Sequence, residues 1–158
     1  MVYEHEISHA FDSSGSQYDK DGNLNNWWTD EDRKAFEEKT AKVAAYFSTI
    51  EAVPGGYVNG EMTVGEAVAD LGGMAVMLEA ASHIDGFDYD AFFRNNAAVW
   101  KKQMSDELAR SKLLTDVHPP GHVRTNANIQ QFDEFYETYD VKPGDGMYLA
   151  PENRLSVW

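Results

Sequence analysis

Residues 5–9 read His-Glu-Ile-Ser-His, an H-E-x-x-H pattern that restricts the local structure more than any other feature of the sequence. Side chains four residues apart share one face of an α-helix, so His5 and His9 can hold one metal ion if this segment is helical. Glu6 then lies beside that face and can reach a water molecule at the metal. The pattern is typical of zinc peptidases, although a surface helix with solvated side chains could carry the same residues.

A catalytic zinc ion usually takes three protein ligands and one water molecule, so a third ligand must come from elsewhere in the chain. Glu66 and Asp70 are the candidates, because they are again four residues apart in a predicted helix. We expect Glu66 to be the third ligand. Asp70 is expected to hydrogen-bond His5, and Asp12 to hydrogen-bond His9, since a carboxylate at the second ring nitrogen fixes the tautomer of a histidine ligand.

Glu66 also has a simpler explanation as a helix-capping residue. Thr63 and Glu66 fit the S/T-x-x-E capping box that often opens a helix ahead of an apolar run. Capping does not account for Asp70, which lies between Ala69 and Leu71 in the middle of the same predicted helix, where an unpaired carboxylate is costly. The ligand interpretation is therefore preferred, with capping as the alternative.

The remaining pattern predicts a mainly α-helical chain with long loops and little strand. Residues 12–26 are rich in Ser, Gly, Asn and Asp and predict a loop, with a short hairpin around Asp21-Gly22. Thr29 with Asp32 predicts a helix start. This helix is expected to run to about residue 50, ahead of a break at Pro54-Gly55-Gly56. The other expected elements are a helix over about 63–82, a helix capped by Asp90 that runs through Met104, a loop over 115–125 that carries His118 and Arg124, and a final helix with Ile129, Phe132 and Tyr136.

Composition bounds the class of protein. With 158 residues, of which 42% are hydrophobic, the chain can bury one modest core, so we expect one domain over residues 1–158. The 27 acidic and 13 basic side chains give a formal charge of −14, which argues against nucleic acids and anionic membrane surfaces as partners. The chain has no cysteine, which excludes disulfides and thiolate metal sites, and no apolar run approaches the roughly 18 residues of a membrane span.

Several motifs follow one another along the chain: residues 5–12, 18–24, 27–29, 59–60, 65–73 and 115–124, and the terminal Val157-Trp158. In this order they resemble the carboxy-terminal catalytic segment of the neprilysin family of zinc metalloendopeptidases, which includes the endothelin-converting enzymes and bacterial endopeptidases of the same type. The sequence departs from the family pattern outside the expected ligands and base. Glycine is usual in the family at Glu4 and Ala10, aspartate at Ser13, asparagine at Ala67 and serine at Pro119.

The resemblance implies a thermolysin-like (gluzincin) fold and a role for each matching residue. The metal site would hold one zinc ion per chain, with His5, His9 and Glu66 as its ligands. Asp12 and Asp70 would be the carboxylates that orient the two histidines. The catalytic residues would be Glu6, His118 and Asp70. Glu6 would act as the general base and His118 would donate a hydrogen bond to the oxyanion. Asp70 would act indirectly, by orienting a histidine ligand. Arg124 would hold a substrate carbonyl.

The activity that the resemblance implies is hydrolysis of oligopeptides by a zinc-activated water molecule, with Glu6 as the base. The alternative is a non-catalytic zinc-binding fragment that is inactive without an upstream portion of the same protein, because family members carry a substrate-binding strand and a lid domain there. Only four residues precede His5, so we expect that such upstream regions are missing here. Animal members have disulfides, so we expect a bacterial protein of the cytoplasm, with the cell surface or secretion as alternatives.

Overall fold

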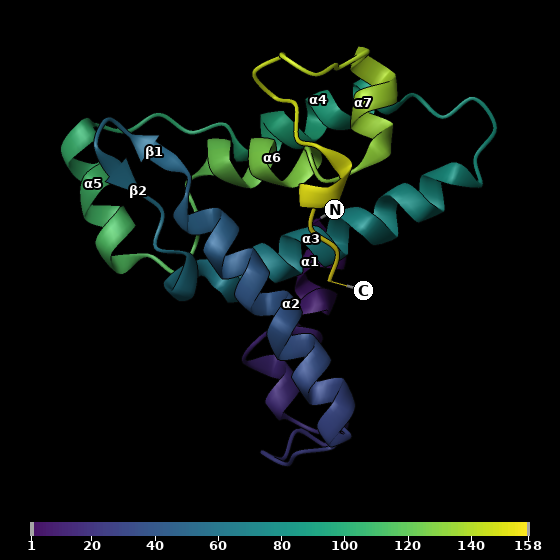
Figure 1. The fold of residues 1–158 in the computed structure, drawn as a ribbon, viewed down its shortest axis with the longest axis vertical. Coiled ribbons are helices and arrows are strands. Elements are labelled where there is room, and N and C mark those ends of the chain that lie inside the picture. Colours follow the sequence, from purple (N-terminus) through teal and green to yellow (C-terminus); the bar gives the residue numbers. More distant parts are fainter. Residues whose placement is uncertain (1, 158) are drawn as a thin grey trace.

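The structure, a computed structural model, describes residues 2–157 and is mostly helical (Figure 1). The helices are α1 (Val2–Ser8), α2 (Asp30–Ser48), α3 (Gly60–Ser82), α4 (Tyr89–Trp100), α5 (Asp106–Thr115), α6 (Gly121–Ile129) and α7 (Asp133–Tyr139), with 3₁₀ turns η1 (His9–Phe11), η2 (Gly15–Gln17) and η3 (Pro151–Asn153). An antiparallel hairpin of β1 (Glu51–Val53) and β2 (Gly56–Tyr57) is the one sheet in this range. The predicted mainly α fold with little strand is therefore confirmed. No helix within residues 2–157 has the length and apolarity needed to cross a membrane.

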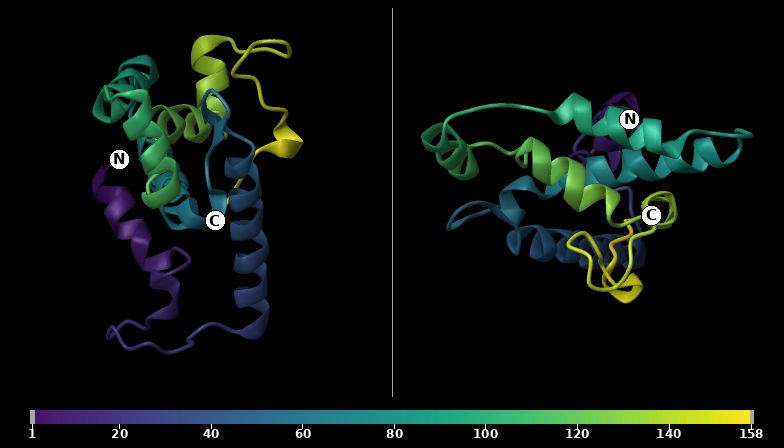
Figure 2. Two further views of the ribbon diagram at one scale, coloured as in Figure 1. Left: turned by 90° about the vertical axis from the view of Figure 1, so that its left-hand side faces the viewer. Right: turned by 90° about the horizontal axis from the view of Figure 1, so that it is seen from above.

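Helix α3 is the centre of the fold. Helices α1, α2 and α6 contact it, and Figure 2 shows α1 and α2 on different sides of it. Residues 67–74 of α3 are all buried, as expected for a helix that is almost entirely apolar around its circumference. Asp70 is the charged exception within this stretch.

Two groups of buried side chains form the core, and α3 contributes to both. The group toward α2 and α6 is Val43, Phe47, Val58, Ala67, Val68, Leu71, Val123, Ala127 and Val157. The group toward α4 and α7 is Met74, Leu78, Phe93, Ile129 and Phe135. Because both groups share α3, this helix holds a fixed position relative to every element that surrounds the candidate site.

Two local predictions in the first third of the chain are confirmed. Tyr18 and Leu24 form an isolated antiparallel bridge around a turn in which Gly22 has a φ of +78°, a conformation that favours glycine. Thr29 is the N-cap of α2, and its side-chain oxygen accepts a hydrogen bond from the backbone N–H of Asp32.

Helices α1 and α3 approach each other closely at Gly73. A β-carbon at this position would lie 2.8 Å from the backbone nitrogen of His5 and 3.1 Å from its α-carbon. Only glycine therefore permits the present spacing of the two helices, and this spacing buries His5 against α3.

We expect Gly73→Ala to lower the free energy of unfolding by about 1–3 kcal/mol, because the added methyl group must push α1 away from α3. Chemical denaturation of the metal-free protein measures this change. Gly146→Ala is the matched control, since a β-carbon there would meet nothing within 4 Å and Gly146 lacks a positive φ. Equal stability of the two variants would contradict the close approach of α1 and α3.

Two helices begin earlier than the sequence pattern predicted. The N-cap of α3 is Asn59, so Thr63 lies within the helix and its hydroxyl donates to the carbonyl of Asn59. The capping-box explanation of Glu66 is therefore wrong. The N-cap of α4 is Asp88 and not Asp90. Several neighbouring polar residues can each act as the N-cap of a helix. The residue that does so is the one at which the backbone changes from extended to helical φ and ψ values.

The region after α4 differs from the prediction. Helix α4 ends at Trp100, so Met104 lies in the extended connection to α5 and not in a helix. Helix α5, capped by the Ser105 side chain, was not predicted. The apolar pattern of α5 is weak, since Leu113 is buried but Leu108 and Leu114 are exposed. The formation of this helix is explained by its N-cap and by residues with high helix propensity.

The last part of the chain contains two helices where one was predicted. Arg124 lies in α6, which starts directly after Pro120, and therefore not in the predicted loop. Pro120 is the N-cap of this helix, and its carbonyl accepts hydrogen bonds from the backbone N–H groups of Val123 and Arg124. The predicted helix through Ile129, Phe132 and Tyr136 is interrupted at Phe132, whose φ of −114° and ψ of 136° are extended, and α7 follows.

Candidate active site

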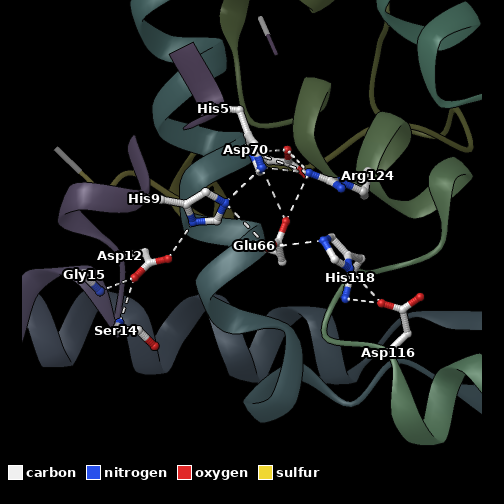
Figure 3. Close-up of polar contacts among 10 residues, drawn as sticks. All are labelled: His5, His9, Asp12, Ser14, Gly15, Glu66, Asp70, Asp116, His118 and Arg124. Atoms are coloured by element: carbon white, nitrogen blue, oxygen red, sulfur yellow. Dashed lines mark hydrogen bonds and ion pairs between the residues drawn. The ribbon is translucent and has the colours of Figure 1, made fainter. Parts of the chain in front are cut away.

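Helices α1 and α3 bring His5, His9 and Glu66 together (Figure 3). His5 lies in α1, His9 begins η1 directly after it, and Glu66 lies in α3. His5 Nε2 is 3.1 Å from His9 Nε2 and 3.4 Å from Glu66 Oε2, and His9 Nε2 is 3.5 Å from Glu66 Oε1. One ligand atom from each side chain lies within 4.8 Å of the others, so the set could hold a metal ion.

The separations between these atoms fit the geometry of a tetrahedral zinc ion. Ligand atoms about 2.0–2.1 Å from zinc at tetrahedral angles lie roughly 3.3–3.4 Å from one another. The observed values are close to this distance: 3.1 Å between the two histidine nitrogens, and 3.4 and 3.5 Å from these nitrogens to the two different oxygens of the Glu66 carboxylate. Three protein ligands leave a fourth coordination position for water or substrate, as in catalytic zinc sites.

The loop after η1 holds His9 through Asp12. Asp12 Oδ2 is 2.7 Å from His9 Nδ1, while Oδ1 accepts hydrogen bonds of 2.7 Å from the backbone N–H groups of Ser14 and Gly15. A buried carboxylate in this position accepts from an Nδ1–H, which leaves His9 Nε2 as a free lone pair facing His5 and Glu66.

Asp70 plays the corresponding part for His5. Its Oδ1 is 2.9 Å from His5 Nδ1. The same carboxylate is held by Arg124, whose Nε and Nη2 each donate at 2.7 Å to different oxygens. Asp70 and Arg124 are 2% and 5% exposed, so this two-pronged pair is shielded from water and holds the carboxylate in one orientation.

The electron-rich atoms of the cluster call for a cation between them. With Nδ1–H groups donated to Asp70 and Asp12, the Nε2 lone pairs of His5 and His9 face each other. Glu66 Oε2 is buried, and its ion-pair contacts with His5 Nε2 and Arg124 Nη2 are both 3.4 Å long. A proton or a metal ion relieves this repulsion, and the N, N, O donor set suits zinc.

The pKa values of the cluster agree with this requirement in the metal-free protein. Burial lowers the pKa of His5, but hydrogen bonds to Asp70 and Glu66 outweigh it and raise the pKa to about 9. Burial raises the pKa of Glu66, but the hydrogen bond with His5 and the nearby charges of His118 and Arg124 bring it below its usual value. His5 therefore holds the proton and Glu66 is an anion.

We expect zinc affinity to increase with pH, by up to about tenfold per pH unit as far as about pH 9, because zinc must displace the proton of His5. Competition with a chelator at several pH values measures the affinity. Asp70→Asn should flatten the dependence of zinc affinity on pH, and a pH-independent affinity would contradict the assignment.

The same proton affects the stability of the metal-free protein. The pKa of His5 is raised on folding, so its proton stabilises the metal-free fold fully below about pH 6.5, and this stabilisation is lost as the pH rises through about 9.

His118 approaches the cluster from the loop between α5 and α6. Its Nε2 is 3.5 Å from Glu66 Oε1, and its Nδ1 is 2.7 Å from Asp116 Oδ1 (Figure 3). Asp116 also accepts a hydrogen bond of 2.7 Å from Lys112 Nζ. This bond, with those from His118, keeps the pKa of Asp116 far below its usual value, so Asp116 is ionised over the whole working range.

Asp116 is the residue near the site to which the sequence pattern gave no role. Its backbone position two residues before His118 allows one oxygen to accept both the backbone N–H and the ring Nδ1 of that histidine. The signal in the sequence was the Asp-x-His spacing within residues 116–118.

A pocket of about 800 Å³ opens beside the cluster. Glu6 is exposed and lines it together with His5, His118 and Arg124. The guanidinium carbon of Arg124 lies 3.8 Å from the ring centre of Trp100, which also lines the pocket. The structure thus brings every predicted site residue to one place, with the base candidate and the oxyanion-donor candidate facing the same space.

Comparison with known proteins gives consistent matches over nearly the whole chain. The sequence profile described as "Peptidase family M13" matches residues 1–155. The "Neutral endopeptidase" of Lactococcus lactis subsp. lactis (strain IL1403) is 48% identical over 157 residues, which cover 99% of this chain and 25% of that protein. This chain therefore spans about a quarter of the length of the curated relatives that it matches.

Solved structures match at a similar level. The crystal structure of PEPO from Lactobacillus rhamnosis HN001 (DR20) has a TM-score of 0.93 and 42% identity, covering 98% of this chain and 25% of that one. The zinc metalloprotease ZMP1 of Mycobacterium tuberculosis, solved in complex with an inhibitor, has a TM-score of 0.87 and 33% identity, covering 98% and 26%.

Proposed function

Because this chain belongs to peptidase family M13, the neprilysin family, we propose that it carries the zinc site and the catalytic groups of an endopeptidase. The observation that supports this most directly is the set of separations between His5 Nε2, His9 Nε2 and the Glu66 carboxylate, which suit one tetrahedral zinc ion per chain. The relative ZMP1, a zinc metalloprotease, supports the choice of metal. The activity is proposed for the whole protein, because this chain covers 25% of the length of the Lactococcus lactis relative.

Glu6 is the proposed general base. Zinc bound by His5, His9 and Glu66 would supply Lewis acidity that polarises the scissile carbonyl and lowers the pKa of the attacking water toward about 7. Glu6 lies one residue after a ligand and lines the pocket, so its carboxylate can take a proton from that water. The same carboxylate then returns the proton to the leaving amine.

His118 and Arg124 are the proposed donors to the substrate. His118 lies on the pocket side of Glu66 and, with its Nδ1–H bound to Asp116, needs a second proton on Nε2 to donate to the developing oxyanion. Arg124 uses Nε and Nη2 for Asp70, which leaves Nη1 for a substrate carbonyl. Asp12 and Asp70 act as positioning residues, through the rings of His9 and His5.

We expect Asp116→Asn to lower kcat by about tenfold or more without loss of zinc, because His118 loses the carboxylate that orients its ring. His118→Ala should cost about a hundred- to a thousandfold. In the His118→Ala background, Asp116→Asn should change kcat little further, because Asp116 acts through the His118 ring. Asp85→Asn, at an exposed site outside the pocket, is the control, and an unchanged kcat in Asp116→Asn would reject the pairing.

Metal analysis and peptide hydrolysis test the proposal as a whole. We expect one zinc ion per chain, and cleavage of oligopeptides that stops when a chelator removes the metal. Comparing this chain with the longer protein separates the two alternatives for its activity. Exposed apolar residues on α1, among them Tyr3 and Ile7, suggest that a further region covers this face, so we propose that cleavage depends on that region. The bacterial relatives are compatible with the predicted bacterial origin, and the compartment remains a prediction.

A further inference from the structure

The pocket beside the cluster is lined by more than the proposed catalytic groups. The connection between α4 and α5, which includes Lys101, Lys102 and Met104, also lines it. Val2 and Trp100 add apolar side chains to the lining. A peptide bound in this pocket would therefore meet apolar side chains and two lysines besides the reacting groups.

The charge of this pocket differs from the charge of the chain. The formal net charge is −14, but the lining contains four lysine or arginine side chains and only two acidic ones, Glu6 and Asp116. Arg124 is paired with Asp70, and Lys112 is paired with Asp116.

Lys101 and Lys102 are the cations of this lining that remain uncompensated. Both are exposed, and within residues 2–157 neither forms an ion pair. Lys101 also ends α4, where its backbone N–H donates to the carbonyl of Ala98, so the position of this residue at the pocket is fixed by the helix end. A local excess of positive charge in an acidic protein attracts anionic groups that the rest of its surface repels.

We propose that Lys101 and Lys102 are specificity-determining residues that bind a carboxylate of the peptide substrate in this pocket. The inference rests on the proposed function, because the pocket adjoins the groups assigned to peptide hydrolysis. The carboxylate can belong to an acidic side chain or to the free C-terminus of the peptide. Both present the same charge and the same acceptor oxygens to a lysine, and the test separates them.

Binding to the Glu6→Gln protein, loaded with zinc, tests the proposal without hydrolysis. One oligopeptide is prepared with glutamate moved through its positions, each with a glutamine counterpart, and with a free or an amidated C-terminus. We expect about two- to fivefold tighter binding of one acidic peptide than of its neutral counterpart, as for an exposed ion pair. Lys101→Gln/Lys102→Gln should remove this difference, and Lys34→Gln/Lys42→Gln on α2, outside the pocket, should keep it.

The pattern of results identifies the source of the carboxylate. A preference for glutamate at one position assigns an acidic side chain, and a preference for the free over the amidated end assigns the C-terminus. The preference should shrink with salt, since the Debye length falls from about 30 Å at 0.01 M to about 3 Å at 1 M. The same peptides are then cleaved by the protein with Glu6 intact, and kcat/KM should follow the binding preference.

Two results would overturn the inference: equal binding of acidic and neutral peptides, or an acid preference that survives in Lys101→Gln/Lys102→Gln. Hydrolysis without any acid preference leaves the proposed function standing and removes only this inference. An acid preference in binding with no hydrolysis of any peptide by the longer protein removes the proposed function and leaves the carboxylate site.

Discussion

Glu6→Gln is expected to keep zinc bound and to lower kcat for peptide hydrolysis by roughly a hundred- to ten-thousandfold. Glutamine has nearly the same shape as glutamate, but its amide cannot accept the proton of the attacking water. Glu6 is exposed in the pocket and is not one of the three clustered donors, so the substitution should leave the metal site and the fold unchanged. Metal analysis and steady-state kinetics on the same preparation measure both effects.

Glu152→Gln provides the matched control, since Glu152 is also exposed but lies outside the pocket. It should behave as the parent protein in both measurements. Turnover of Glu6→Gln within a few-fold of the parent, with zinc at full occupancy, would show that another group acts as the base. Loss of zinc from Glu6→Gln would instead make the carboxylate part of the metal site.

The double substitution His5→Ala/His9→Ala should abolish both zinc binding and hydrolysis. It removes two of the three converging donors and leaves Glu66 alone, which cannot provide a tetrahedral zinc site. The loss should far exceed the roughly 10–100-fold fall in metal affinity expected when Asp12 or Asp70 is changed to asparagine, because those residues act only through the histidines. Zinc per chain and peptide cleavage are the two readouts.

His83→Ala is the control for this variant, since His83 is exposed at the end of α3 and belongs to no metal-binding group among the described residues. It should retain full zinc occupancy and activity. One equivalent of zinc in the double variant would place the metal elsewhere in the chain. The metal-free double variant should remain folded but with a lower free energy of unfolding, because the apolar core around α3 does not include the two histidines, while His5 is buried against α3.

Much of the candidate metal site could be predicted because its parts are local. His5 and His9 are four residues apart, and so are Glu66 and Asp70, so the helical repeat alone puts each pair on one face. The structure brings all four together, although His9 begins the 3₁₀ turn η1 and does not lie in α1 as the helical repeat predicted. The matches over residues 1–155 confirm the predicted family. Their roles as ligands and orienting groups are proposals that the variants above test.

The predictions that failed concern the ends of helices. Asn59, not Thr63, begins α3, and Arg124 lies in α6 rather than in a loop. Helix α5 was missed because its cap and helix-forming residues, and not an apolar stripe, account for it. The free energies that separate alternative caps are about 1 kcal/mol, so tertiary contacts decide which of several adjacent polar residues begins a helix.

By itself the sequence determined the family, the mainly helical fold and the residues able to bind a metal, because these follow from motifs and from periodicity within single helices. Only the tertiary structure decided that Glu66 lies 3.4 Å from His5, and that His118 and Arg124 reach the same place. The physical reason is that distances between helices depend on packing, here on the close approach that Gly73 permits between α1 and α3. A pattern of residues identifies which side chains can meet, and the packed core holds them within a few ångströms of one another.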